Sequence, residues 1–115
     1  MKKVYHLKKC TTCHKILEKL NWDGETQEIR SEKITEKQLD EMAVLAGSYE
    51  ALFSRRAIKY KTMKLKDKIL CEADYKQLIL DEETFLKRPI FLIDGAIFIG
   101  NTKKVLKAVQ AILHE

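Results

Sequence analysis

Near the start of the chain, the apolar positions form a continuous run, then a helical stripe, then a second short run. Val4–Leu7 is bounded by lysines and predicts a buried strand. The next apolar positions recur at the spacing of one helix face, namely Cys13, Ile16, Leu17 and Leu20. After a turn-like break at residues 21–24, Thr26–Ile29 predicts a second strand. A helix joins the two strands, so they are expected to run parallel.

The middle of the chain has helical spacing interrupted by polar stretches. Thr35 with Gln38 three residues later forms a capping box, and Gly47 is the expected helix stop. The apolar stripe of this helix is expected at Leu39, Met42, Ala43, Leu45 and Ala46. Residues 55–68 are rich in lysine and lack a clean period, so they predict short helical turns and loop. Glu72–Asp81 returns to helical spacing and predicts another helix.

The C-terminal part predicts a hairpin followed by a helix. Ile90–Ile93 and Ala96–Ile99 flank Asp94 and Gly95, a pair that tolerates the positive φ of a two-residue hairpin turn. Both arms are continuously apolar, which favours strands covered by helices on both faces. Thr102 can cap a last helix. The apolar positions of that helix are Val105, Leu106, Val109, Ile112 and Leu113.

This order of elements is βαβ, then a helical insertion, then ββα. Cys10 and Cys13 stand at the first strand-to-helix turn, and a CxxC at that place is typical of thioredoxin-like proteins. We therefore predict an α/β, thioredoxin-like fold with a mixed sheet. It forms one domain over residues 1–115, with the helical insertion at about residues 35–85. The only proline, Pro89, precedes the third strand and is a candidate for a cis peptide bond.

Size and composition narrow the classes of function. The chain has 115 residues, of which 45% are hydrophobic and 34% charged, as in an ordinary globular protein. No apolar run is long enough to cross a bilayer, and the N-terminus does not read as a signal peptide, so no membrane partner is expected. Three cysteines without an export signal favour a reducing compartment, the cytoplasm. The net charge of +5 is a modest bias toward anionic partners, but basic and aromatic residues are not interleaved, so direct nucleic-acid binding is not expected.

The paired cysteines are the candidate reactive groups. A helix start stabilises a thiolate, so the pKa of Cys10 is expected below the value of about 8.5 for a free cysteine. The same helix start, at Thr11 and Thr12, is expected to hold a bound anion. The spacing of Cys13 suits attack on a mixed disulfide at Cys10, although its place on the apolar stripe also allows a simple core role. Cys71 has no partner spacing and is expected to be filler. A structural zinc site needs four ligands, and no second pair is present, so no metal is expected.

Further segments carry a resemblance to a known family. Tyr5 and His6 precede Cys10, the run Gly47–Arg56 lies before the insertion's lysine-rich part, and Lys87–Ile90 leads into the hairpin. With these segments, nearly the whole chain resembles the arsenate reductase (ArsC) family and the related Spx transcription regulators. The resemblance implies a thioredoxin-like fold with an inserted helical subdomain.

The resemblance also implies a set of site residues. Cys10 would be the reactive thiol. His6 would help to lower the pKa of that thiol, although its place at the end of the first strand also allows a packed, hydrogen-bonded role. Arg56 would face Cys10 from the insertion, and Arg88 from the proline loop at Pro89. A guanidinium cannot lose its charge and offers a planar fork of donors, which suits a tetrahedral oxyanion.

Three departures from the arsenate reductase pattern bear on the substrate. Leu7 and Lys8 stand where arsenate reductases usually carry Asn-Pro, and Asn101 replaces a third arginine. Both weaken arsenate as the substrate. Cys13 stands where arsenate reductases generally have no cysteine, whereas many Spx proteins have CxxC. This departure favours Spx-like or glutaredoxin-like chemistry.

Three functions follow as hypotheses. The first is a thiol oxidoreductase of the arsenate reductase family, in which Cys10 attacks an oxyanion or a disulfide. Cys13, glutathione, glutaredoxin or thioredoxin would resolve the intermediate, and no bound cofactor is required. The second is an Spx-like regulator that binds RNA polymerase and uses the cysteine pair as a switch. The third is a small glutaredoxin-like disulfide reductase.

Overall fold

The chain divides into two compact units. The computed structural model describes residues 2–7 and 11–113, and the side chains of residues 2–7 and 14–113. One unit, the sheet unit, comprises Met1–Lys33 and Arg88–Glu115, and the other, the inserted unit, comprises Ile34–Lys87. That the two units form one domain stays a prediction.

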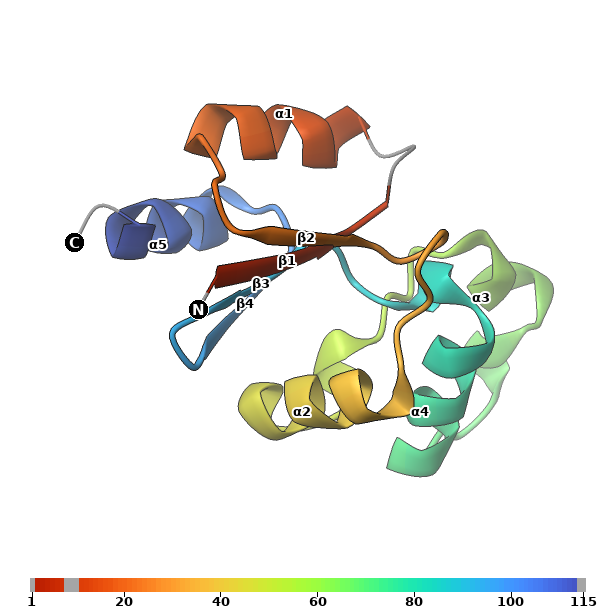
Figure 1. The fold of residues 1–115 in the computed structure, drawn as a ribbon. Coiled ribbons are helices and arrows are strands. Elements are labelled where there is room, and N and C mark those ends of the chain that lie inside the picture. The colour runs from red at the N-terminus through yellow and green to blue at the C-terminus, as the bar shows by residue number, and fades with distance from the viewer. Residues whose placement is uncertain (1, 8–10, 114–115) are drawn as a thin grey trace. The chain divides into compact units, whose positions relative to one another are not determined.

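The sheet unit holds a four-stranded mixed sheet and two helices (Figure 1). Its elements in chain order are β1 (Lys2–His6), α1 (Thr11–Leu20), β2 (Glu25–Glu28), β3 (Ile90–Ile93), β4 (Ala96–Ile99) and α5 (Lys103–Leu113). The strand order is β2-β1-β3-β4. β1 runs parallel to β2 and antiparallel to β3, and β3 runs antiparallel to β4. The predicted βαβ and ββα parts are therefore confirmed.

The first two strands begin earlier than their apolar runs predict. β1 covers Lys2–His6 rather than 4–7, and β2 covers Glu25–Glu28 rather than 26–29. Lys2 pairs with Ile93 of β3, and Lys3 pairs with Glu25 of β2. Strand pairing uses backbone groups, so polar residues can extend a strand beyond its apolar part.

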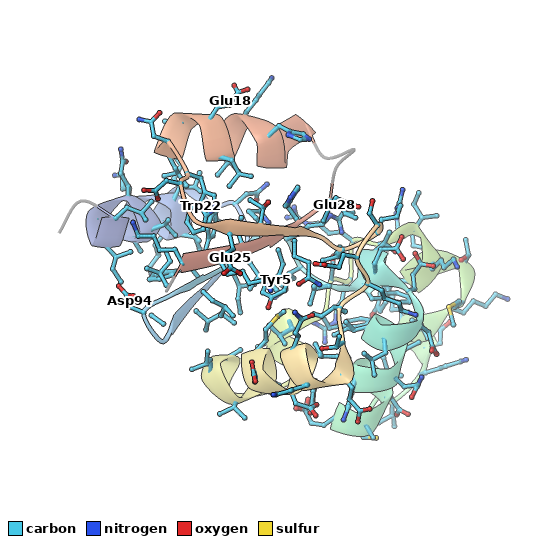
Figure 2. All side chains as sticks on the ribbon, viewed as in Figure 1. Tyr5, Glu18, Trp22, Glu25, Glu28 and Asp94 are labelled. Carbon is cyan, nitrogen blue, oxygen red and sulfur yellow. The ribbon has the colours of Figure 1, made fainter. Side chains whose placement is uncertain are left out.

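One face of the sheet packs against α1 and α5 (Figure 1). The buried residues of this cluster are Val4, Ile16, Leu20, Phe91, Ile93 and Val109. Trp22 joins it from the loop after α1, with its ring centroid 5.5 Å from that of Phe91 (Figure 2). On the outer side of α1, Glu18 points away from the sheet (Figure 2).

The hairpin of β3 and β4 has the predicted bounds and turn. Asp94 and Gly95 have φ values of 48° and 84°, as a two-residue hairpin turn requires. The predicted burial is correct for β3, of which only Leu92 is not fully buried, but wrong for β4, in which all four residues are half-buried. β4 lies at the edge of the sheet and has one neighbouring strand, so fewer atoms cover it.

Gly24 occupies a position that has no room for a side chain. A Cβ added there would lie 2.7 Å from the Lys2 carbonyl oxygen and 2.8 Å from Trp22 Cζ2. Gly24→Ala is therefore expected to lower the free energy of unfolding by about 1–3 kcal/mol, because backbone at the start of β1 has to move. Urea titration measures the effect. Gly47→Ala is the comparison variant. Gly47 has a φ of 97° and open space around its Cα, so its loss of stability reports backbone strain without crowding.

The inserted unit consists of short helices. They are α2 (Glu36–Ala46), the 3-10 helix η1 (Glu50–Leu52), α3 (Ile58–Thr62), η2 (Leu65–Asp67), α4 (Glu72–Asp81) and η3 (Glu83–Phe85). The capping box of Thr35 with Gln38 and the left-handed Gly47 at the end of α2 are confirmed. Leu45 is 44% exposed, so the prediction that it belongs to the buried stripe is wrong. The helix is buried on a narrower face, at Leu39, Met42 and Ala43.

Phe53 is the centre of an aromatic cluster in the inserted unit. Its side chain is fully buried and stacks on Phe85, with ring centroids 5.0 Å apart. The rings of Tyr75 and Tyr60 contact it edge-on at 4.9 and 6.1 Å. Phe53 and Leu86 also form an isolated antiparallel β-bridge, which joins the residue after η1 to the residue after η3.

Candidate functional site

The end of β1 and the start of β3 meet at one end of the sheet. Tyr5 pairs with Ile90, so His6 and Pro89, the next residues outward on their strands, lie at the same end. The peptide bond between Arg88 and Pro89 is cis, which confirms the prediction for this proline. Pro89 is buried, and its carbonyl oxygen accepts a hydrogen bond of 2.9 Å from the Gly100 N–H.

Helix α1 begins directly after Cys10. Its first residue is Thr11, and its first turn contains no acidic residue that would neutralise the positive end of the helix dipole. This local arrangement agrees with a stabilised thiolate. Cys10 itself lies outside the described residues, as do the side chains of Thr11, Thr12 and Cys13. The roles assigned to these four residues therefore stay predictions.

His6 is the last residue of β1 and lies close to another histidine. Its ring centroid is 6.1 Å from that of His14, at an interplanar angle of 73°. The Nδ1 atom of His6 is buried, and no hydrogen-bond partner for it lies among the described residues. His14 is exposed, as an amphipathic helix predicts. The influence of His6 on Cys10 stays a prediction.

The two neighbouring arginines of the inserted unit have different surroundings. Arg55 Nη2 lies 2.8 Å from Glu50 Oε2 and 3.2 Å from the Tyr75 hydroxyl. The hydrogen bond from Arg55 lowers the pKa of Glu50, and the hydrogen bond to Glu50 raises the pKa of Arg55. Arg56 is exposed, and its guanidinium has no partner within the described part of the chain.

These positions bring some of the predicted site residues together. His6, Arg88, Pro89 and the start of α1 all belong to the sheet unit, and Arg88 is half-buried there. Arg56 belongs to the inserted unit, so its approach to Cys10 stays a prediction. The difference between Arg55 and Arg56 does support the choice of Arg56, because Arg55 is already engaged by Glu50.

The family follows from a sequence comparison. The sequence profile of the ArsC family matches residues 5–109. The chain belongs to the ArsC family. A comparison with curated proteins gives no match.

Solved structures show that this ArsC chain has the thioredoxin-like α/β fold of its family. An arsenate reductase from Vibrio cholerae is 17% identical, with 96% of each chain covered and a TM-score of 0.76. An arsenate reductase related protein from Brucella melitensis is 21% identical, with 93% of this chain and 92% of that chain covered and a TM-score of 0.71. The protein SACOL0876 from Staphylococcus aureus is 25% identical, with 94% of this chain and 97% of that chain covered and a TM-score of 0.74.

The described part of this ArsC chain contains neither a metal cluster nor a bilayer-spanning helix. No three His, Cys, Asp or Glu residues in it come together in a way that could hold a metal ion. None of its helices has the length and apolar character that crossing a bilayer requires.

Sequence reasoning missed a polar network in the inserted unit of this ArsC protein. Lys76 Nζ lies 2.9 Å from Glu36 Oε1 and 3.0 Å from Asp40 Oδ1, and the Tyr49 hydroxyl donates to the same Asp40 oxygen at 2.5 Å. The Glu72 carboxylate accepts the Tyr49 and Glu50 N–H groups. These contacts join α2, η1 and α4. Partners up to 40 residues apart leave no local signal in the sequence.

This network and two further ion pairs of the inserted unit make stability depend on pH. The Tyr49 hydrogen bond, followed by Lys76, lowers the pKa of Asp40, and hydrogen bonds from Lys59 and Arg55 lower the pKa values of Glu82 and Glu50. A depressed folded-state pKa stabilises the fold above the unfolded value and loses that effect as pH falls.

We therefore expect the urea concentration at the unfolding midpoint to decrease once the pH drops below roughly 4, where the carboxylates of the unfolded chain titrate. Asp40→Asn should lower the urea midpoint at neutral pH. It should also reduce the decrease of the midpoint between pH 7 and pH 3. Glu41→Gln, an exposed neighbour on the same helix, is the control. A midpoint that does not change between pH 7 and pH 3 would contradict the prediction.

Proposed function

We propose that this ArsC family member is a thiol oxidoreductase that reduces an arsenate-class oxyanion. The observation that carries the proposal is the family match over residues 5–109, which includes the cysteine pair and both candidate arginines. The absence of acidic residues in the first turn of α1 supports it, because that turn can then stabilise both a thiolate and a bound oxyanion. Such chemistry fits a compartment that keeps thiols reduced, such as the cytoplasm.

The reaction requires two electrons, which two thiols supply. The Cys10 thiolate attacks the arsenic(V) centre, and one oxygen leaves as water. A second thiolate, from Cys13, glutathione or a protein such as glutaredoxin or thioredoxin, then attacks the Cys10 sulfur. The electron pair of the sulfur–arsenic bond goes to arsenic, which leaves as arsenite, and Cys10 is left in a disulfide. A further thiol reduces that disulfide.

The charges on the oxyanion need donors that stay protonated. Arg88 and Arg56 are the proposed guanidinium groups, and the N–H groups at the start of α1 add to them. Pro89 would shape the same site from the start of β3. His6, with its buried Nδ1, would help to keep Cys10 ionised.

The test is a steady-state assay of arsenite formation from arsenate, with glutathione and glutaredoxin or thioredoxin as reductants. We expect turnover that saturates with arsenate. A disulfide substrate is assayed in parallel with the same reductants. If the disulfide is reduced and arsenate is not, the protein is a glutaredoxin-like reductase and the oxyanion proposal is wrong.

Arg56→Lys is expected to lower kcat/KM for arsenate by about 10- to 100-fold, because an ammonium cannot replace the two parallel hydrogen bonds of a guanidinium. Arg55→Lys is the matched control, since it keeps a positive charge beside Glu50 at the neighbouring position. Steady-state kinetics of both variants check the prediction. Equal losses in the two variants would show that the assignment of Arg56 is wrong.

A second candidate function is an Spx-like redox switch that binds RNA polymerase. The CxxC of Cys10 and Cys13, and Asn101 in place of the third family arginine, favour it. This function predicts a reversible disulfide that changes affinity for the polymerase with negligible turnover. A pull-down of purified polymerase under reducing and oxidising conditions tests it. Absence of the polymerase under both conditions would exclude this function.

A further inference from the structure

The positive charge of this protein is concentrated in one segment. Residues 55–69, called the basic segment below, hold seven of the 22 Lys and Arg residues and one of the 17 Asp and Glu residues. They carry a formal charge of +6, whereas the whole chain carries +5. The rest of the chain is therefore close to neutral. The segment contains α3 and η2 and is green in Figure 1.

Most of these cations are free to meet a partner. Arg55 is paired with Glu50 at 2.8 Å, and Lys59 with Glu82 at 2.6 Å. The side chains of the other five are exposed and have no partner within the part of the chain that the structure describes: Arg56, Lys61, Lys64, Lys66 and Lys68. The free charges therefore face solvent and do not hold the inserted unit together.

Aliphatic side chains protrude between the lysines. Ile58 is 80% exposed, Ile69 is 102% exposed and Met63 is 42% exposed. Among residues 55–69, only Ala57 and Leu65 are buried. Exposed aliphatic groups gain free energy when they leave water, so this segment offers both free charge and apolar area to a partner.

Three kinds of anionic partner could bind this charge, namely an acidic protein, a nucleic acid and a membrane surface. They differ in which uncharged residues they require beside the lysines. Protein interfaces are depleted of lysine, so a protein partner does not fit the segment well. Single-stranded nucleic acid binds through bases stacked on aromatic residues, and the only aromatic residue of the segment is the half-buried Tyr60. Exposed isoleucines gain nothing from phosphates. An anionic membrane surface uses both features, because lysines meet the lipid headgroups and aliphatic side chains enter the layer below them.

We propose that the basic segment docks on an anionic membrane surface, with Lys61, Lys64 and Lys66 at the headgroups and Ile58 and Ile69 inserted beside them. This contact is peripheral and needs no spanning helix. The docking residues do not include Arg56, which lies in the same segment but is assigned to the proposed chemistry at Cys10.

The test is co-sedimentation of the full chain with vesicles. We expect binding to vesicles with about 30% phosphatidylglycerol in phosphatidylcholine, no binding to pure phosphatidylcholine, and release at high ionic strength. Lys61→Gln/Lys64→Gln/Lys66→Gln should weaken binding on the order of 100-fold, from about fivefold per lysine. Ile58→Ser/Ile69→Ser should weaken it roughly tenfold or more. All these residues are exposed, so the variants should keep the circular dichroism spectrum of the parent.

A matched triple variant distinguishes a docking surface from overall charge. Lys19→Gln/Lys103→Gln/Lys107→Gln removes three exposed lysines of α1 and α5 and should change vesicle binding much less. Equal losses in the two triple variants would overturn the proposal, as would no binding to anionic vesicles. Binding of duplex DNA at the same affinity, unchanged by Ile58→Ser/Ile69→Ser, would also overturn it and identify a general polyanion surface.

Discussion

Cys10→Ser is expected to abolish arsenate reduction, with a loss of roughly 1,000-fold or more in kcat/KM. A serine hydroxyl stays protonated at neutral pH and cannot form the disulfide whose formation supplies the two electrons. The measurement is arsenite formation with glutathione and glutaredoxin in excess. Undiminished turnover in this variant would remove Cys10 as the nucleophile.

Cys71→Ser is the matched control for this loss. Cys71 is exposed, stands at the N-terminal end of α4 and donates from Sγ to Asp74 Oδ2 at 3.2 Å. It therefore stands at a helix start in the inserted unit, and its lack of a role in the reaction stays a prediction. Its removal should leave turnover within about twofold of the parent, since a surface substitution outside the site has a small effect.

Cys13→Ser separates the two roles left open for this residue. If Cys13 resolves the intermediate, a single turnover remains while steady-state turnover falls, and excess glutathione restores it. If Cys13 is only part of the α1 stripe, both measurements stay close to those of the parent.

Phe53→Ala is expected to have the largest effect on stability, about 3–5 kcal/mol in the free energy of unfolding. The substitution removes a fully buried ring that contacts Phe85, Tyr75 and Tyr60, and leaves a cavity at the centre of the inserted unit. Phe53→Leu should cost less because it fills part of the space. Val44→Ala, at a position that is 81% exposed, should have almost no effect. A loss of less than about 1 kcal/mol for Phe53→Ala would contradict this packing.

Two probes of the same titration would also test the single-domain prediction. Trp22 is the only tryptophan and belongs to the sheet unit, so its fluorescence reports unfolding there. Far-ultraviolet circular dichroism is dominated by helices of both units. If the units unfold together, the two transitions coincide in Phe53→Ala. A fluorescence transition that keeps the midpoint of the parent would show two independent units.

The parts of the fold with short-range signals could be predicted from the sequence. The capping box of Thr35, the bounds of α4 and the hairpin around Asp94 and Gly95 depend on residues within a few positions of one another. The partial exposure of β4 and of Leu45 could not be predicted in this way. Both depend on which elements pack against them, and that is decided by residues distant in the sequence.

The candidate site was predictable in a different sense. The pattern of Cys10 and Cys13 before a helix predicts a reactive thiolate without any comparison. Arg56 and Arg88 are identified only through the resemblance to the ArsC family. Without it, any arginine is most simply a surface ion-pair residue. The structure adds a physical reason to prefer Arg56 over Arg55, because the Glu50 carboxylate already holds Arg55.

The pairing of β1 with β3 has a consequence for the order of folding. Lys2 pairs with Ile93, so the centre of the sheet closes a loop that includes all of Ile34–Lys87. Closing a long unstructured loop is entropically costly, and distant pairings slow the search for the native state. During synthesis, β1 and β2 leave the ribosome without β3, so one edge of β1 stays unpaired until the final quarter of the chain emerges. Early folding of the insertion would shorten the tether between the two halves and reduce the time for which the nascent protein can aggregate.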